Sequence, residues 1–142
     1  MANAKDAIIL DDKAQALAHY PHARKVGNLL FLCGTSSRKP DNSHVGVTVH
    51  NDGSVDLDIE AQTEAVIENM RGILQAAGAD LDALVDVTTF LVNMDDFKGY
   101  NKVYNRFFDK ETGPARTTVA VHQLPHPNLL IEIKGIAVLP TS

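Results

Sequence analysis

Residues 59–77 constrain the fold of this 142-residue chain most strongly, because their apolar side chains fall on one helical face. These side chains recur at intervals of three and four: Ile59, Val66, Ile67, Met70, Ile73, Leu74 and Ala77. The spacing is typical of an amphipathic α-helix, and Gly78 follows as a residue that commonly ends one. The segment therefore predicts a helix that needs a second layer to cover its apolar face.

Strand-forming segments precede this helix. Residues 23–37 predict two strands joined at Gly27, and the second, 29–33, is continuously apolar, which indicates burial on both faces. Further on, apolar residues alternate on both sides of an Asn-Asp-Gly turn, as in a β-hairpin. The alternating residues are Val47 and Val49 before the turn, and Val55 and Leu57 after it.

A second helix follows the next predicted strand. Residues 84–92 are rich in β-branched residues and predict a buried strand. Asp95 or Asp96 can cap the helix after it. That helix carries the aromatic residues Phe97, Tyr100, Tyr104, Phe107 and Phe108, which predict a face packed against the core.

The last strands complete a single domain. After Gly113 and Pro114, residues 116–121 and 129–139 predict two strands, separated by a connection with two prolines. The order of elements predicts an α+β domain over residues 1–142, with two helices on one face of a mixed sheet. Residues 1–19 are polar and alanine-rich and predict a surface lead-in.

Composition excludes several classes of function. The formal net charge is −5 and no run of Lys or Arg occurs, which argues against nucleic acid as a partner. The single cysteine, Cys33, cannot close an intramolecular disulfide, and the N-terminus lacks a signal-peptide pattern, so we expect a cytoplasmic protein. No apolar run approaches the roughly 20 residues that cross a bilayer, so we expect no membrane association.

Two opposite charges stand in the last two predicted strands. Arg116 follows the Gly-Pro pair, and its guanidinium suits a planar carboxylate; the alternative is a surface arginine in a solvent-screened ion pair. Glu132 lies among apolar neighbours, where a carboxylate is costly unless it is paired or used. The alternative for Glu132 is an outward position on an edge strand, since Lys134 shares its face.

Other chemistry has weaker support in the sequence. The six histidines form no HExxH pattern and the one cysteine has no CxxC partner, so we expect no metal site, and no phosphate-binding glycine motif predicts a cofactor. Cys33 fits a core position, although Gly34 beside it lets a ligand approach the backbone. A catalytic triad could be composed from Ser36, His22 and Asp41, but the sequence around the serine lacks the nucleophile-elbow motif that would support it.

Several motifs together resemble the Rid (reactive intermediate deaminase, YjgF-like) family over nearly the whole chain from Tyr20 onward. They are PARTTV at 114–119, LP at 124–125, IEI with IA at 131–137, NKVYNRFF at 101–108, AGADLDALVDVTTFL at 77–91, EAQTEAVIENM at 60–70 and FLCG at 31–34.

The resemblance implies a chorismate-mutase-like subunit in a homotrimer, with the sheets packed into a central barrel and a pocket at each subunit interface; further assembly to a hexamer stays open. It also implies a hydrolase in which Arg116 binds a substrate carboxylate and Glu132 activates the water that hydrolyses an enamine or imine. The remaining implied substrate-binding residues are Tyr20, Cys33, Gly34, Asn101 and Thr118. Neither a metal nor a cofactor is implied.

Within the family, the sequence looks closest to the 2-aminomuconate deaminases of aromatic-compound degradation, which form 4-oxalocrotonate and ammonia. Two alternatives stay open: a broad-range 2-imino-acid deaminase and a non-enzymatic module that binds small ligands. The chain reads Cys-Gly-Thr at 33–35 where the family usually has Ser-Gly-Gln, and its loop 36–52 is longer. A second carboxylate on the substrate predicts a second cationic contact, for which Arg38 and Lys39, or His122 and His126, are the candidates.

Overall fold

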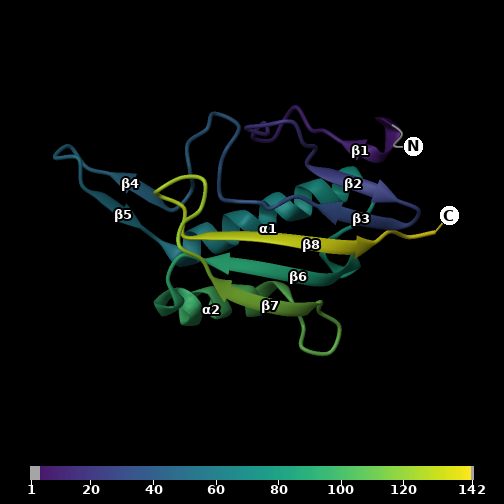
Figure 1. The fold of residues 1–142 in the computed structure, drawn as a ribbon. Coiled ribbons are helices and arrows are strands. Elements are labelled where there is room, and N and C mark those ends of the chain that lie inside the picture. Colours follow the sequence, from purple (N-terminus) through teal and green to yellow (C-terminus); the bar gives the residue numbers. More distant parts are fainter. Residues whose placement is uncertain (1–3, 142) are drawn as a thin grey trace.

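A six-stranded mixed sheet forms the centre of the protein in a computed structural model that describes residues 4–141 (Figure 1). In spatial order its strands are β1 (Ala7–Ile8), β2 (Ala23–Val26), β3 (Leu29–Leu32), β8 (Ile131–Val138), β6 (Leu84–Leu91) and β7 (Ala115–Ala120). Neighbouring strands are antiparallel except β6 and β7, which are parallel and are connected through a helix. The predicted mixed sheet is confirmed.

Two helices cover one face of this sheet, as the sequence predicts (Figure 1). They are α1 (Ile59–Ala76) and α2 (Phe97–Phe107). The carboxylate of Asp58 accepts a hydrogen bond from Ala61 N and caps the start of α1. Gly78 ends the helical run with a positive φ of 84°, a conformation that favours glycine. The apolar stripe of α1 is buried against the sheet.

The start of α2 differs from the sequence-based prediction. Asn93, rather than Asp95 or Asp96, uses its side chain as a cap, accepting a hydrogen bond from Asp95 N at 2.9 Å. A 3-10 turn, η3 (Met94–Asp96), then leads into α2. Asp96 makes no side-chain cap because its backbone is already helical, with φ −80° and ψ −4°, whereas a capping residue typically has extended backbone.

The two faces of the sheet differ in their environment. On the helix face, Leu30 and Leu32 of β3 are buried. Leu29 and Phe31 point to the opposite, open face and are 36% and 39% exposed. The prediction that 29–33 is buried on both faces is therefore wrong for the single chain, because both helices pack on the same side and no described element covers the other.

The hairpin predicted around the Asn-Asp-Gly turn is confirmed as a separate two-stranded sheet. Its strands are β4 (Val47–Val49) and β5 (Val55–Leu57), with Val47 opposite Leu57. In Figure 1 the hairpin projects from the same end of the molecule as the beginning of α1. It therefore extends beyond the core and leaves the sheet faces free.

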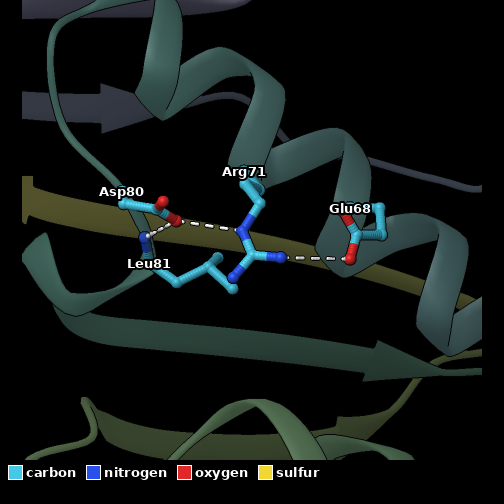
Figure 2. Close-up of polar contacts among 4 residues, drawn as sticks. All are labelled: Glu68, Arg71, Asp80 and Leu81. Carbon is cyan, nitrogen blue, oxygen red and sulfur yellow. Dashed lines mark hydrogen bonds and ion pairs between the residues drawn. The ribbon is translucent and has the colours of Figure 1, made fainter.

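Charged side chains fasten the end of α1 to the segment that leads into β6 (Figure 2). Arg71 contacts Asp80 through Nε at 3.0 Å and Glu68 through Nη1 at 3.3 Å. The same oxygen of Asp80 accepts a hydrogen bond from Leu81 N, the first residue of the turn η2 (Leu81–Ala83). These bonds lower the pKa of Asp80, that from Leu81 N having the largest effect. These contacts hold the segment directly before β6 against the end of α1.

Part of the predicted surface lead-in, residues 1–19, belongs to the sheet. After a short turn, η1 (Ala4–Asp6), strand β1 pairs with β2, and Ile8 and Leu10 pack against the core. The ring of His22 holds the segment that follows, since Leu10 N donates to Nδ1 and Nε2 donates to Ala14 O. Residues 1–3 of the lead-in lie outside the described part of the chain.

Candidate active site

Arg116 and Glu132 lie on opposite faces of the sheet. Arg116 of β7 is opposite Val87 of β6, which is buried on the helix face. Glu132 of β8 is opposite Phe90 of β6, which is three residues after Val87 and therefore on the other face of β6. The side chains next to Glu132 in β8, Ile131 and Ile133, are buried on the helix face. Since successive strand residues alternate between faces, Glu132 points to the open face. One chain alone therefore does not direct both side chains at the same ligand.

Glu132 is on a central strand, between β3 and β6, so the alternative of an outward edge position is wrong. Its side chain lines a hollow of about 310 Å³, within the range of small-molecule sites. The hollow is also lined by Tyr20, Gly34, Arg38, His44 and His126. Two predicted substrate-binding residues, Tyr20 and Gly34, thus lie together with Glu132.

The carboxylate of Glu132 has no hydrogen-bond or ion-pair partner among residues 4–141. Burial raises the pKa of Glu132, and the positive charge of Arg38 opposes this shift only in part. A carboxyl group of this kind exchanges protons at higher pH than an exposed glutamate does. The position has the properties expected of a general acid and base.

Gly34 brings backbone directly against this carboxylate. A Cβ added at Gly34 would overlap Glu132 Oε1, so a larger residue there would displace the glutamate. The neighbouring Cys33 is half-buried, and burial raises the pKa of its thiol, which keeps it protonated and unreactive. Cys33 lines a smaller adjoining hollow with Tyr20, Gly34 and Arg38.

The long loop that carries Arg38 is ordered by backbone pairing. An isolated β-bridge joins Arg38 to His44, and the turn between them contains Asn42 with a positive φ of 70°. From α1, the amide of Asn69 donates to Ser36 O at 2.9 Å and to Arg38 O at 3.4 Å. The loop is thereby held over the hollow. Lys39 is exposed and is absent from the hollow's lining.

The connection before β8 supplies His126 to the same hollow. Gln62 of α1 is fully buried and ties this connection down: it donates to Asn128 O and accepts from Leu130 N, both at 2.9 Å. Asn128 N donates to Nδ1 of His126 at 3.0 Å, so the ring proton of neutral His126 is on Nε2. The rings of His126 and His44 are in contact, with centroids 4.4 Å apart. His122 is exposed and does not line the hollow.

Arg116 lies over an aromatic cluster on α2. Its Cζ is 4.6 Å from the ring centroid of Tyr104, 4.8 Å from that of Tyr100 and 5.7 Å from that of Phe97. None of the ion pairs among residues 4–141 includes Arg116, so it is not the screened surface pair considered above. Cation–π contacts hold its guanidinium while leaving its hydrogen-bond donors for a ligand.

Two further predicted residues accompany Arg116. Thr118 shares its face of β7, and Asn101 follows Tyr100 on α2. The hydroxyl of Thr118 and the amide oxygen of Asn101 are buried without a hydrogen-bond partner. Burial raises the pKa of Tyr104 to about 12, so its phenol stays neutral beside Arg116. This second group of polar atoms can receive part of a ligand.

In the part of the chain that the structure describes, the side chains that the other candidate chemistries would need do not come together. Both ring nitrogens of His22 bond to backbone, and the carboxylate of Asp41 accepts from Ser43, so the triad of Ser36, His22 and Asp41 does not form. Among residues 4–141 no three His, Cys, Asp or Glu side chains gather as metal ligands would. Neither helix of that range has the length and apolar character of a membrane span.

Gln62 and Asn69 are the functional neighbours that the sequence analysis missed. They lie seven residues apart and therefore on one side of α1, where each fixes one loop of the Glu132 hollow. The only signal in the sequence is their position: polar amides inside an otherwise apolar helix stripe.

A family profile described as "Endoribonuclease L-PSP" matches residues 11–139, almost the whole chain. This profile covers the YjgF-like proteins, and the resemblance of the motifs points to the same group. The chain belongs to the Rid family.

Members of the Rid family from distant organisms are similar to this chain throughout. The RutC family protein PYRAB12510 of Pyrococcus abyssi is 37% identical over 134 residues, 94% of this chain and 97% of that protein. The chloroplastic Reactive Intermediate Deaminase A of Arabidopsis thaliana is 37% identical over 139 residues, 97% of this chain and 68% of that protein. The crystal structure of the yeast protein YEO7 has a TM-score of 0.81 at 34% identity, covering 94% of this chain and 98% of that one.

These likenesses confirm the Rid fold of two helices on a mixed sheet. They are less uniform about activity, since one relative is named a deaminase and the family description names an endoribonuclease. Membership supports deaminase chemistry in general terms. The substrate has to be argued from the site.

Proposed function

We propose that this Rid protein is a hydrolase that deaminates small enamines and imines bearing a carboxylate, with 2-aminomuconate as substrate. The observation that carries the proposal is the carboxyl group of Glu132, which is half-buried, has a raised pKa and faces a hollow of molecular size. A group of this kind is suited to proton transfer at a reacting centre. The relative named Reactive Intermediate Deaminase A supports the reaction class.

Water is the only co-reactant that the proposed reaction needs. The enamine first tautomerises to an imine. The oxygen of water then bonds to the imine carbon while Glu132 takes a proton from the water and returns it to nitrogen. Glu132 takes the hydroxyl proton of the resulting carbinolamine and passes it to nitrogen. The carbon–oxygen double bond then forms as the carbon–nitrogen bond breaks, and ammonia leaves. From 2-aminomuconate the other product is 4-oxalocrotonate.

Arg116 would hold the carboxylate next to the imine carbon through two parallel hydrogen bonds. Its contacts with the rings of Tyr100 and Tyr104 orient the guanidinium before the substrate arrives. Preorganisation of this kind lowers the entropic cost of binding. The hydroxyl of Thr118 would donate to the same carboxylate, and the amide oxygen of Asn101 would accept from the neighbouring imine N–H.

The opposite orientation of Arg116 and Glu132 supports a site shared between subunits. We propose a homotrimer in which the open faces of three sheets pack together and Arg116 of one chain approaches Glu132 of the next. Apolar residues are available for this packing: Val26, Leu29, Phe31 and Val138 are between 36% and 57% exposed on the open face. Exposed apolar patches of this kind commonly mark interfaces between proteins.

Ammonia release from freshly generated 2-aminomuconate tests the reaction, and mixed assemblies test the shared site. Glu132→Gln and Arg116→Ala chains are inactive alone in this scheme. Co-expressed with different affinity tags, they should form mixed trimers with about one in three sites intact, because each site takes its arginine and glutamate from different chains. Inactive mixed trimers would show that each site lies within one chain. No ammonia from wild-type protein would refute the reaction itself.

A further inference from the structure

Three hydrogen-bond donors gather beside Glu132 with no assigned role in the proposed reaction. Arg38 and His44 come from the long loop, and His126 comes from the connection before β8. None of the ion pairs among residues 4–141 includes Arg38. Asp41 and Asp52, the acids of the same loop, accept hydrogen bonds from the backbone and hydroxyl groups of Ser43 and Ser54. The positive charge of Arg38 therefore has no carboxylate partner other than the nearby Glu132.

Arg38 is fixed but retains binding capacity. One Nη donates to Asn42 Oδ1 at 2.8 Å and the other to the carbonyl of Gln15. A guanidinium has five donors, so at least three stay free. The bonds to Asn42 and Gln15 reduce the side-chain entropy that binding would otherwise cost.

His44 acts as a neutral donor rather than as a second charge beside Arg38. Burial lowers the pKa of His44, and the charges of His126 and Arg38 lower it further. In neutral His126 the proton is on Nε2, because Nδ1 accepts from Asn128 N. Since the two rings are in contact, an anion between them and Arg38 would accept hydrogen bonds from the guanidinium and from Nε2 of His126. The arrangement is complementary to a compact anion such as a carboxylate.

We propose that Arg38, His44 and His126 form a subsite for a second carboxylate, so that the enzyme prefers dicarboxylic over monocarboxylic substrates. This inference rests on the proposed function, in which Arg116 takes the first carboxylate. A second carboxylate near Glu132 would be repelled unless local donors compensated its charge, and these three residues supply the compensation. Lys39, although adjacent in sequence, is exposed and takes no part.

Equilibrium binding of two matched probes tests the subsite without any turnover. Muconate and sorbate share a six-carbon diene, but sorbate has a methyl group where muconate has its second carboxylate. Calorimetry with wild-type protein should show at least about ten-fold tighter binding of muconate, since hydrogen bonds to charged groups are strong. Arg38→Gln and His126→Asn should each remove most of this preference while sorbate binding stays unchanged.

Matched controls are the exposed residues Lys39 and His122. Lys39→Gln removes the same charge as Arg38→Gln, and His122→Asn the same ring as His126→Asn, so both controls should keep the muconate preference. Equal binding of the two probes by wild-type protein, or equal effects of Lys39→Gln and Arg38→Gln, would overturn the subsite. A muconate preference in a protein that releases no ammonia would support the subsite and refute the reaction. Turnover without the preference would support the reaction and refute the subsite.

Discussion

Glu132 illustrates how the surroundings of one residue set its chemistry. The backbone of Gly34 and the neighbouring strands remove water from its carboxyl group, and this raises its pKa. Arg38 is the one described charge that offsets the effect. The same burial that raises the pKa also holds the group in place, since a side chain at Gly34 would displace it.

Replacing Glu132 by Gln should lower kcat by about 10²- to 10⁴-fold, the usual contribution of a general acid or base, and leave KM nearly unchanged. Glutamine keeps the size of the side chain but accepts no proton from water. Steady-state kinetics would check this, with Arg116→Lys as the contrasting variant. Arg116→Lys should mainly raise KM, because an ammonium group cannot bind a carboxylate through two parallel hydrogen bonds. A Glu132→Gln enzyme with near-normal kcat would move the proton transfer to another residue.

The pH profile should depend on Arg38. Glu132 must be ionised to take a proton from water, so kcat/KM should fall on the acid side as this carboxylate becomes protonated. Arg38 lowers the pKa of Glu132 against the larger effect of burial. Arg38→Gln should therefore raise this pKa and move the acid limb of the profile to higher pH. His44 and His126, which also line the hollow, are unchanged in this variant. Lys39→Gln is the control and should leave the acid limb of the profile at its wild-type pH.

At the scale of elements, α1 both builds the core and positions the site. Its apolar stripe packs on the sheet, while Gln62 and Asn69 reach the two loops that carry His126 and Arg38. Because both loops are attached to one rigid helix, the distance between them is fixed by its geometry. The site thus has a stable frame although most of its polar residues lie outside regular elements.

Gln62→Ala should lower the free energy of unfolding by roughly 1–3 kcal/mol, because it leaves the partly buried Leu130 N and Asn128 O without their partner and removes a fully buried side chain. Urea denaturation would measure this. Glu64→Ala, at an exposed position of the same helix, should change stability by no more than about 0.5 kcal/mol. An equally small effect of Gln62→Ala would mean that the connection before β8 does not depend on α1.

At the scale of the whole molecule, the sheet is covered on one side only. The helices lie behind the central strands in Figure 1, and the opposite face has no described element over it. Leu29, Phe31 and Val138 are adjacent on this open face through the pairing of β3 with β8. An uncovered apolar face of this kind favours association with further copies of the chain.

Phe31→Lys should break the proposed trimer and abolish turnover while leaving the single chain folded. Phe31 is already 39% exposed, so lysine costs little in the monomer, but an unpaired charge buried at an interface costs several kcal/mol. Light scattering would report the mass, and circular dichroism the fold. Phe31→Leu, which keeps an apolar side chain, should remain assembled. An active monomeric Phe31→Lys protein would contradict the shared site.

The sequence determined most of the elements of this protein, but strand β1 was missed because its two residues are too short for a pattern. Periodicity located both helices, β-branched segments located the central strands, and the Asn-Asp-Gly turn located the hairpin, because these signals are local and depend on neighbouring residues. Its motifs also indicated the Rid family. The sequence could single out Arg116 and Glu132 only as opposite charges in apolar strands, and their roles as catalytic partners remain a prediction.

Only the tertiary structure decided which faces these residues occupy. A one-residue difference in strand phase places Glu132 on the open face and Arg116 on the helix face, and a continuously apolar strand such as 29–33 carries no pattern that reveals its phase. His44 and His126 come together through loops held by Gln62 and Asn69, contacts between residues far apart in the chain. Such contacts depend on the packing of the whole domain, and local sequence patterns do not encode them.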